Sequence, residues 1–143
     1  MTVRSILDSK GTGVVTVEPS ADLASVVKLL ATRRIGALVV IGSDQRIAGI
    51  ISERDIIREL AARGATALEQ KVGLVMTRKI VTCSRAETIS GVMDLMTAGK
   101  FRHLPVVDEG RLIGIVSIGD VVKHRVQEIE SESATLRDYI RST

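Results

Sequence analysis

Two stretches of the chain carry apolar residues at the spacing of an amphipathic helix. The apolar positions recur at i, i+3, i+4 and i+7, the period of a helix with one buried face. They are Leu23, Val26, Val27 and Leu30 in the first stretch, and Ile89, Val92, Met93 and Met96 in the second. The pattern therefore predicts two helices of the same design, one in each half of the chain.

The strands expected around each helix also come in matching sets. A short β-prone segment precedes the helix, an apolar run follows it, and a polar turn leads into a last apolar strand. These segments are 15–17, 37–41 and 49–52 in the first half, and 81–83, 103–107 and 114–117 in the second. The polar turn, 42–45 or 108–110, is one residue longer in the first half.

Each half therefore reads strand, helix, strand, turn, strand, helix, and the chain is an internal duplication. We expect an α/β (α+β) fold of two β-α-β-β-α repeats packed by pseudo-twofold symmetry, because one half alone would bury too little apolar surface. The first repeat with its N-terminal lead-in is assigned to 1–68, the second to 69–126, and the linker to 63–66. The apolar lead-ins are Val3, Ile6 and Leu7 in the first half, and Val72, Val75 and Met76 in the second.

The C-terminal segment has a different apolar period. Its positions alternate spacings of four and three, which is typical of a coiled-coil seam. They are Val122, Val126, Ile129, Ser133, Leu136 and Ile140. We predict a long final helix, extending over 127–143, that packs on a partner subunit. The alternative is that this apolar seam folds back on its own chain.

The composition describes an ordinary soluble globule and narrows the candidate functions. Of 143 residues, 45% are apolar and 26% are charged. No apolar run approaches the roughly 20 residues that span a bilayer, so we expect a cytoplasmic protein without a membrane segment. The single cysteine, Cys83, excludes an internal disulfide, and the two histidines lack zinc-site spacing, so no metal is expected.

Charge and aromatic content bear on nucleic-acid binding. One Tyr, one Phe and no Trp leave few side chains on which bases could stack. A net charge of +3 is far from the dense basic stripe of a duplex binder. Nucleic acid is therefore a disfavoured partner, although a pI of about 9.4 keeps it as an alternative.

Each half ends its last strand with serine and places aspartate three residues later. The pairs are Ser52 with Asp55 and Ser117 with Asp120. This spacing is that of a helix capping box. It also suits a ligand, because the carboxylate accepts hydrogen bonds from vicinal hydroxyls and the N–H groups of a helix N-terminus favour phosphate. Capping alone remains the alternative interpretation.

The repeated segments together resemble a tandem pair of CBS (cystathionine-β-synthase) domains, a Bateman module of the stand-alone bacterial type. The segments that carry the resemblance are 15–17, 35–40, 49–55, 81–83, 101–107 and 114–120. The resemblance implies a regulatory module for adenosine ligands such as AMP, ADP, ATP, S-adenosylmethionine or NAD(H). Such a module would sense energy or redox state and signal to a separate effector protein, as a homodimer and without catalysis or a catalytic cofactor.

The resemblance also implies roles for individual residues. Asp55 and Asp120 would hold ribose hydroxyls, with Ser52 and Ser117 at ribose or phosphate. The phosphate candidates are Arg54, Lys100, Arg102 and His103, with Arg34 nearby. The adenine contacts would be Thr16, Val17, Ala37, Leu38, Thr82, Cys83, Leu104 and Pro105.

The two halves diverge where the phosphate residues are expected. Gly36 and Ala37 in the first half correspond to Arg102 and His103 in the second. This asymmetry predicts two sites that differ in ligand or affinity. Cys83 is expected to be a small buried residue, and His124, on the last helix, to lie at the surface.

Two other functional classes compete with a ligand sensor. An enzyme is disfavoured because no Ser-His-Asp, Cys-His or paired-carboxylate constellation and no Gly-rich P-loop motif can be assembled. A nucleic-acid-binding protein or a purely structural dimerisation unit is the alternative function. The structural unit predicts no thermal response to any adenosine ligand.

Overall fold

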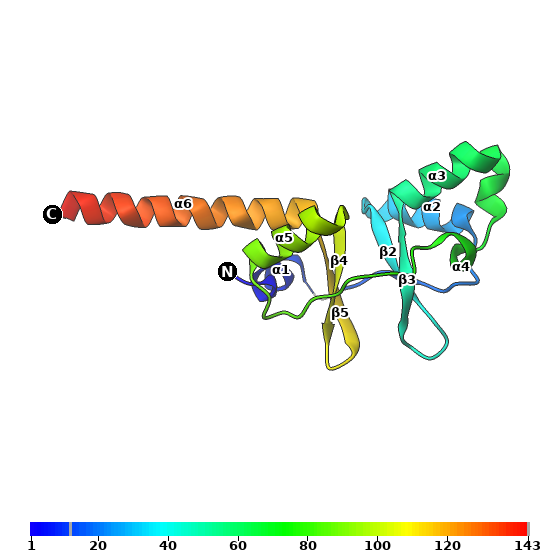
Figure 1. Cartoon of the computed structure of the whole chain (residues 1–143), viewed down its shortest axis with the longest axis horizontal. Helices are drawn as coiled ribbons and strands as arrows, with labels where there is room; N and C mark the ends of the chain where they lie inside the picture. The colour runs from blue at the N-terminus through cyan, green and yellow to red at the C-terminus, as the bar shows by residue number, and fades with distance from the viewer. Residues whose placement is uncertain (12, 143) are drawn as a thin grey trace. The chain divides into compact units, whose positions relative to one another are not determined.

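The structure is a computed structural model that describes residues 1–11 and 13–142. The chain divides into two compact units, a first unit of Val14–Val81 and a second unit of Met1–Gly13 with Thr82–Thr143 (Figure 1). Both are mixed α and β structures, and a long C-terminal helix belongs to the second, which confirms the predicted fold class.

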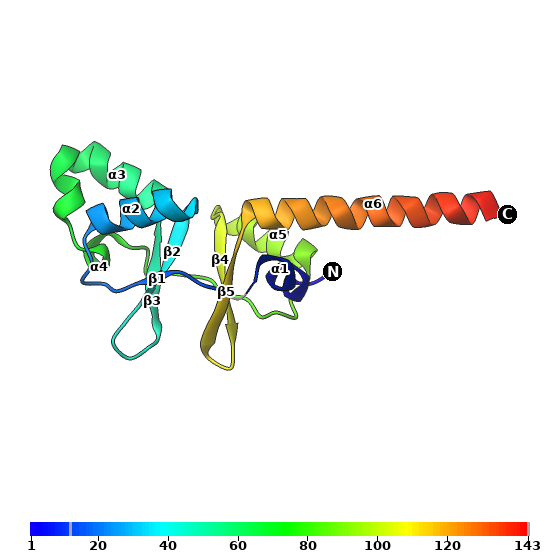
Figure 2. The same ribbon diagram turned by 180° about the vertical axis from the view of Figure 1, so that it is seen from behind.

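The first unit is a three-stranded sheet with helices. Its elements are β1 (Thr16–Val17), α2 (Leu23–Arg33), β2 (Ala37–Ile41), β3 (Ile47–Ser52), α3 (Glu53–Arg63), a 3-10 helix (Gly64–Glu69) and α4 (Val72–Val75). The strand order is β1-β2-β3, with β1 parallel and β3 antiparallel to the central β2 (Figure 2). Helix α2 is capped at its N-terminus by Asp22, whose carboxylate accepts the Ser25 N–H at 2.9 Å. Of the four apolar positions that the periodicity predicts for the buried face, α2 buries Leu23, Val26 and Leu30, whereas Val27 is exposed.

The second unit repeats this plan with a smaller sheet. Its elements are α1 (Val3–Lys10), α5 (Ile89–Gly99), β4 (His103–Asp108), β5 (Arg111–Ser117) and α6 (Ile118–Ser142). Strands β4 and β5 pair antiparallel, and α5 buries Ile89, Val92 and Met96 in the core. Thr88 caps α5 by accepting the Gly91 N–H at 2.9 Å.

The strand expected at 81–83 is reduced to one isolated bridge. Cys83 pairs in parallel with Val106, and its N–H donates to the Pro105 carbonyl at 3.1 Å. A second pair would require an N–H from Pro105, which proline lacks. Val39 stands at the equivalent position of the first unit, and there β1 pairs with it. A single residue of the partner strand thus ends the ladder.

Each apolar lead-in packs in the core of the unit that holds the other repeat, and not with the repeat that it precedes in sequence. Val3 and Ile6 of α1 precede the first repeat but are buried in the core of the second unit. Val72 and Met76, beside or in α4, precede the second repeat but belong to the core of the first unit. Each compact unit is therefore completed by the lead-in of the other repeat.

The segment expected to link the repeats has a structure of its own. Residues Gly64–Glu69 form a 3-10 helix, and Ala67 within it is fully buried. The segment expected to link the repeats is therefore structured, and its helix is part of the first unit. A buried alanine there carries no periodic signal in the sequence.

Helix α6 buries one face near its start. Val121 is fully buried and His124 is only 6% exposed, so the prediction of a surface histidine is wrong. The His124 Nδ1 lies 3.0 Å from the Asp120 carbonyl oxygen, which can only accept, so Nδ1 carries the hydrogen.

Across the described residues, no helix combines the length and apolarity needed to cross a membrane.

Candidate functional site

The first Ser-Asp pair forms a complete capping box at the junction of β3 and α3. The Ser52 N–H donates to Asp55 Oδ2 at 2.9 Å, and the Asp55 N–H donates to Ser52 Oγ at 3.4 Å. Ser52 lies opposite Ala37 in the β2–β3 ladder, so the predicted adenine wall and ribose carboxylate meet at one end of the sheet. The capping interpretation is confirmed, and it leaves the carboxylate oriented by the backbone.

The other oxygen of Asp55 is held by a residue far away in sequence. Thr77 Oγ1 donates to Asp55 Oδ1 at 3.1 Å, and the Arg58 guanidinium lies 3.9 Å from the same oxygen. Thr77 is fixed by its backbone, which exchanges two hydrogen bonds with Ile50 at 2.8 and 2.9 Å. Asp55 is only 7% exposed. The Thr77 hydroxyl binds the carboxylate oxygen to which a ribose hydroxyl would bind in the predicted site. No sequence pattern indicates this role for Thr77.

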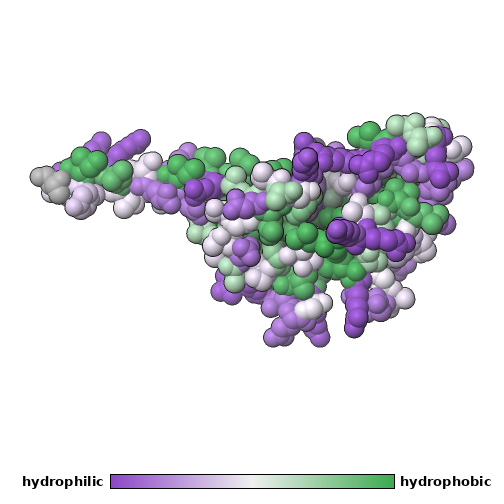
Figure 3. Space-filling view, in the orientation of Figure 1, coloured by the Kyte–Doolittle hydropathy of each residue, from purple (hydrophilic) through white to green (hydrophobic). Residues whose placement is uncertain are grey.

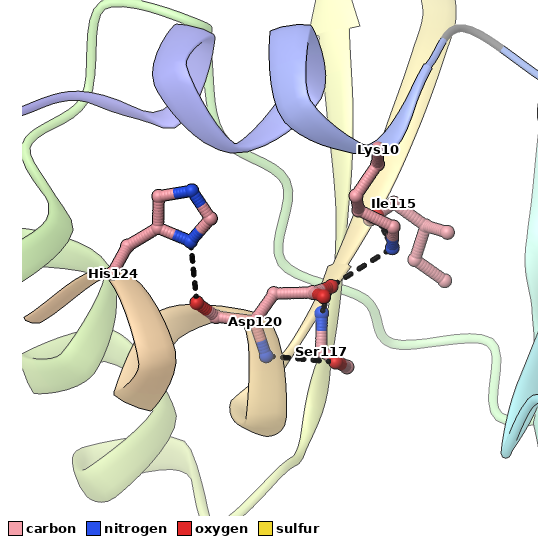
Figure 4. A network of polar contacts seen from close by, with 5 residues as sticks. All are labelled: Lys10, Ile115, Ser117, Asp120 and His124. Atoms are coloured by element: carbon pink, nitrogen blue, oxygen red, sulfur yellow. Dashed lines mark hydrogen bonds and ion pairs between the residues drawn. The ribbon is translucent and has the colours of Figure 1, made fainter. Parts of the chain in front are cut away.

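The second Ser-Asp pair repeats the box but has a different neighbour (Figure 4). The Ser117 N–H donates to Asp120 Oδ2 at 2.9 Å, and the Asp120 N–H donates to Ser117 Oγ at 3.2 Å. Lys10, at the end of α1, donates from Nζ to Asp120 Oδ2 at 2.8 Å and to the Ile115 carbonyl at 2.9 Å. Here the ammonium donates directly to the carboxylate, whereas in the first unit the direct donor is the Thr77 hydroxyl and the Arg58 cation lies 3.9 Å away.

The ammonium changes the titration of Asp120. Partial burial alone would raise the pKa of this carboxyl, but the hydrogen bond from Lys10, the Ser117 N–H and the Lys10 charge together hold the pKa below its usual value. A lowered pKa in the folded protein means that the contact stabilises the fold at neutral pH. This stabilisation is lost as the pH falls through the folded-state pKa.

We predict that Lys10→Met raises the pKa of Asp120, since burial then acts without the opposing cation. The measurement is a carboxyl titration by nuclear magnetic resonance on both proteins. Lys28→Met removes an exposed lysine of the first unit and should leave the Asp120 titration unchanged. An unaltered Asp120 pKa in Lys10→Met would show that the ion pair is absent in solution.

The helix N-termini are less open to phosphate than the sequence suggests. The Glu53 N–H donates to the Gly36 carbonyl at 3.0 Å, and the Ile118 N–H donates to the Arg102 carbonyl at 2.8 Å. Asp55 and Asp120 donate theirs to the capping serines. Two of the first three N–H groups of each helix therefore already have partners within the chain, which leaves side-chain cations as the stronger phosphate candidates.

The predicted adenine residues divide into accessible and buried positions. Thr16 and Val17 line a surface depression together with residues 18–21, 41–43 and 45. Leu38 and Leu104 are fully buried in the two cores, so only their backbone is within reach of a ligand. Pro105 is buried as well, and Thr82 is exposed beside Cys83.

The predicted phosphate residues of the second unit lie close to its Ser-Asp box. His103 is opposite Ser117 in the β4–β5 ladder, and Arg102 is exposed next to it. Lys100 follows α5 in the left-handed conformation at φ 57°, as Arg34 follows α2 at φ 56°. Both units therefore present a cation directly after the equivalent helix, Arg34 after α2 and Lys100 after α5. In the first unit Arg54 is also exposed, in the first turn of α3.

Cys83 has the properties of a packing residue. It is 8% exposed and belongs to the core of the second unit. Burial, together with the charge of Glu87, raises the pKa of its thiol to about 11, so the reactive thiolate is scarce at neutral pH. Within residues 1–11 and 13–142, no group of three or more His, Cys, Asp or Glu side chains could hold a metal ion.

Comparison with known proteins identifies the repeat. The family model described as "CBS domain" matches residues 3–62 and 72–127. The chain is similar to a crystal structure of a CBS-domain containing protein from Agrobacterium tumefaciens, with 44% identity and a TM-score of 0.84. That match covers 87% of this chain and 92% of the other.

Two further relatives broaden the comparison. The mitochondrial CBS domain-containing protein CBSX3 of Arabidopsis thaliana is 40% identical over 80% of this chain, which spans 58% of that protein's length. The CBS domain pair of protein MJ0100, crystallised with 5-methylthioadenosine and S-adenosyl-L-methionine, has the same fold at 24% identity and a TM-score of 0.79. That match covers 90% of this chain and 98% of the other.

Proposed function

The chain belongs to the CBS-domain family, and from this premise we propose that it is a regulatory module that binds adenosine nucleotides at its two Ser-Asp boxes. CBS pairs are generally regulatory rather than catalytic, and a relative of the same fold was crystallised with two adenosine compounds. The proposed ligands are AMP, ADP, ATP or NAD(H), whose level would report energy or redox state. The module would act in the cytoplasm, as a homodimer, on a separate effector protein.

The observation that carries this proposal is the arrangement of Asp55. Its carboxylate is oriented by Ser52, is nearly buried, and accepts a hydroxyl hydrogen bond from Thr77. A ribose hydroxyl can replace the Thr77 hydroxyl with no change in the number or type of hydrogen bonds. The exchange costs little, because the exposed Thr77 side chain can then bond to water.

The second site is proposed to favour phosphorylated ligands. A ribose that approaches Asp120 must share the carboxylate with Lys10 or displace it. A displaced ammonium is well placed to pair with a phosphate, and Arg102 and Lys100 add positive charge in the same unit. A neutral adenosine offers no such compensation. We therefore expect the first site to accept adenosine itself and the second site to require phosphate.

The test is thermal unfolding with adenosine, AMP, ADP, ATP, NAD⁺, NADH and S-adenosylmethionine in parallel. A ligand present at about 100 times its dissociation constant adds about 2.7 kcal/mol to the stability, which is readily seen as a shift in Tm. GMP is the matched control, since it has the same ribose phosphate on another purine. A selective shift with adenosine compounds supports the proposal, and no shift with any of them overturns it.

A further inference from the structure

Helix α6 carries an exposed apolar stripe along most of its length. We define the stripe by Val122, Val126, Ile129 and Leu136, which are between 45% and 59% exposed. The heptad pattern continues at Ile140, which is 63% exposed. Figure 3 shows hydrophobic side chains spaced along this helix among hydrophilic ones. The alternative interpretation, in which this seam folds back on its own chain, is not what the structure shows.

The stripe and the buried face of α6 point in different directions. Val121 and His124 face the second unit and are buried. At about 100° of rotation per residue, they lie roughly 100° to 160° around the helix from Val122. A partner can therefore cover the stripe without disturbing the packing of α6 on its own unit.

We propose that a second copy of this chain covers the stripe, with the two α6 helices forming a parallel, in-register, two-stranded coiled coil. The stripe occupies heptad positions a and d, which leaves charged residues at the flanking positions e and g. Position e holds Lys123, Glu130 and Arg137, and position g holds Arg125, Glu132 and the uncharged Tyr139. In such a dimer each g residue faces the e residue five positions later on the other helix.

The flanking charges are complementary in the parallel arrangement. Arg125 faces Glu130 of the second copy, and Glu132 faces Arg137 of the second copy. By symmetry each contact occurs twice, which makes four attractive pairs. Arg125 also bonds Glu128 of its own helix, so the Glu132–Arg137 contacts are the cleaner test. Charges at e and g decide orientation in coiled coils, and here the charges of both heptads favour the parallel orientation.

In an antiparallel arrangement with full overlap of the seam, the flanking charges are not complementary. There e residues face e residues and g residues face g residues. Glu130 would meet Glu130 and Glu132 would meet Glu132, while Lys123 would meet Arg137. All these contacts are repulsive, so the charge pattern selects the parallel helix pair.

The single polar residue of the seam supports the same register. Ser133 lies at an a position, and in a parallel, in-register pair it faces Ser133 of the second copy. The polar groups are then confined to one layer, where the two hydroxyls can bond to each other. In the antiparallel pair Ser133 would face Ile129 twice. A polar a-position residue is a known determinant of register.

This inference does not depend on nucleotide binding, because none of its residues belongs to the Ser-Asp boxes. It is tested first by sedimentation equilibrium of the full chain. We expect a dimer whose dissociation constant rises at least about 100-fold in Ile129→Asp/Leu136→Asp, since two carboxylates per chain enter the seam. Thr135→Asp adds a carboxylate to the same helix outside the stripe and should leave the dimer intact.

Three results of the sedimentation experiment would overturn the proposal. They are a monomeric wild type, a trimer, and a dimer that the double aspartate variant leaves unchanged. The last result would assign dimerisation to another surface, such as the exposed Ile57. Because both replaced residues are exposed, circular dichroism should show a folded variant in each case.

Orientation is tested by disulfide formation and by charge exchange. Leu136→Cys should form a disulfide between copies under mild oxidation, because position 136 faces itself only in the parallel, in-register pair. Asp138→Cys, on the far side of the helix, should not. Glu132→Arg should weaken the dimer about tenfold, and Glu132→Arg/Arg137→Glu should restore it. Absence of the disulfide at 136 would overturn the parallel register, and a disulfide without restoration by the charge exchange would overturn the Glu132–Arg137 pairing.

Discussion

Replacing Asp55 with alanine should weaken adenosine binding at the first site by about 10- to 100-fold and leave the second site intact. The variant removes the carboxylate that Ser52 orients and that Thr77 now occupies. A hydrogen bond to a charged group contributes about 1.5–3 kcal/mol, which corresponds to that range of affinity. Isothermal titration calorimetry with AMP measures both sites in one experiment.

Asp120→Ala is the matched control in the other unit. It should affect only the second site and should also release Lys10 from its ion pair. Asp55→Asn separates binding from helix capping, because an amide oxygen can still accept the Ser52 N–H. Unchanged affinity at both sites in the two alanine variants would refute the assignment of ribose to these carboxylates.

Replacing Gly49 with alanine should destabilise the first unit by about 1–3 kcal/mol. A Cβ at this position would lie 2.5 Å from the Thr77 carbonyl oxygen and 2.9 Å from the Met76 sulfur. The Thr77 backbone cannot retreat easily, because its N–H and carbonyl both pair with Ile50. Any movement would also pull Thr77 away from Asp55, so first-site affinity should change together with stability. Urea unfolding followed by circular dichroism measures the loss.

Gly114→Ala provides the comparison at the equivalent position of the second unit. Its Cβ would lie 2.5 Å from Leu7 Cδ2, the end of a flexible side chain that can change rotamer. We expect a loss below about 1 kcal/mol, clearly smaller than for Gly49→Ala. Equal losses in the two variants would contradict the role of the Thr77 backbone.

Much of the local structure follows from the order of residues along the chain. The duplicated spacing of apolar residues predicted α2 and α5, and the Ser-x-x-Asp spacing predicted the capping box at the start of α3. These features depend on neighbours within a few residues, where helix periodicity and side-chain-to-backbone bonds act directly. The strand at 81–83 was the local failure, because its ladder depended on Pro105, a residue on another strand.

The sequence by itself therefore determined the duplicated repeat, its helices and the position of both carboxylates. Only the tertiary structure decided what those carboxylates touch. Thr77 reaches Asp55 and Lys10 reaches Asp120 because the lead-in segments pack against the opposite repeats. Long-range packing of this kind minimises exposed apolar surface over the whole chain, and no local pattern encodes it. Tertiary packing likewise buried His124, which was expected at the surface of the last helix.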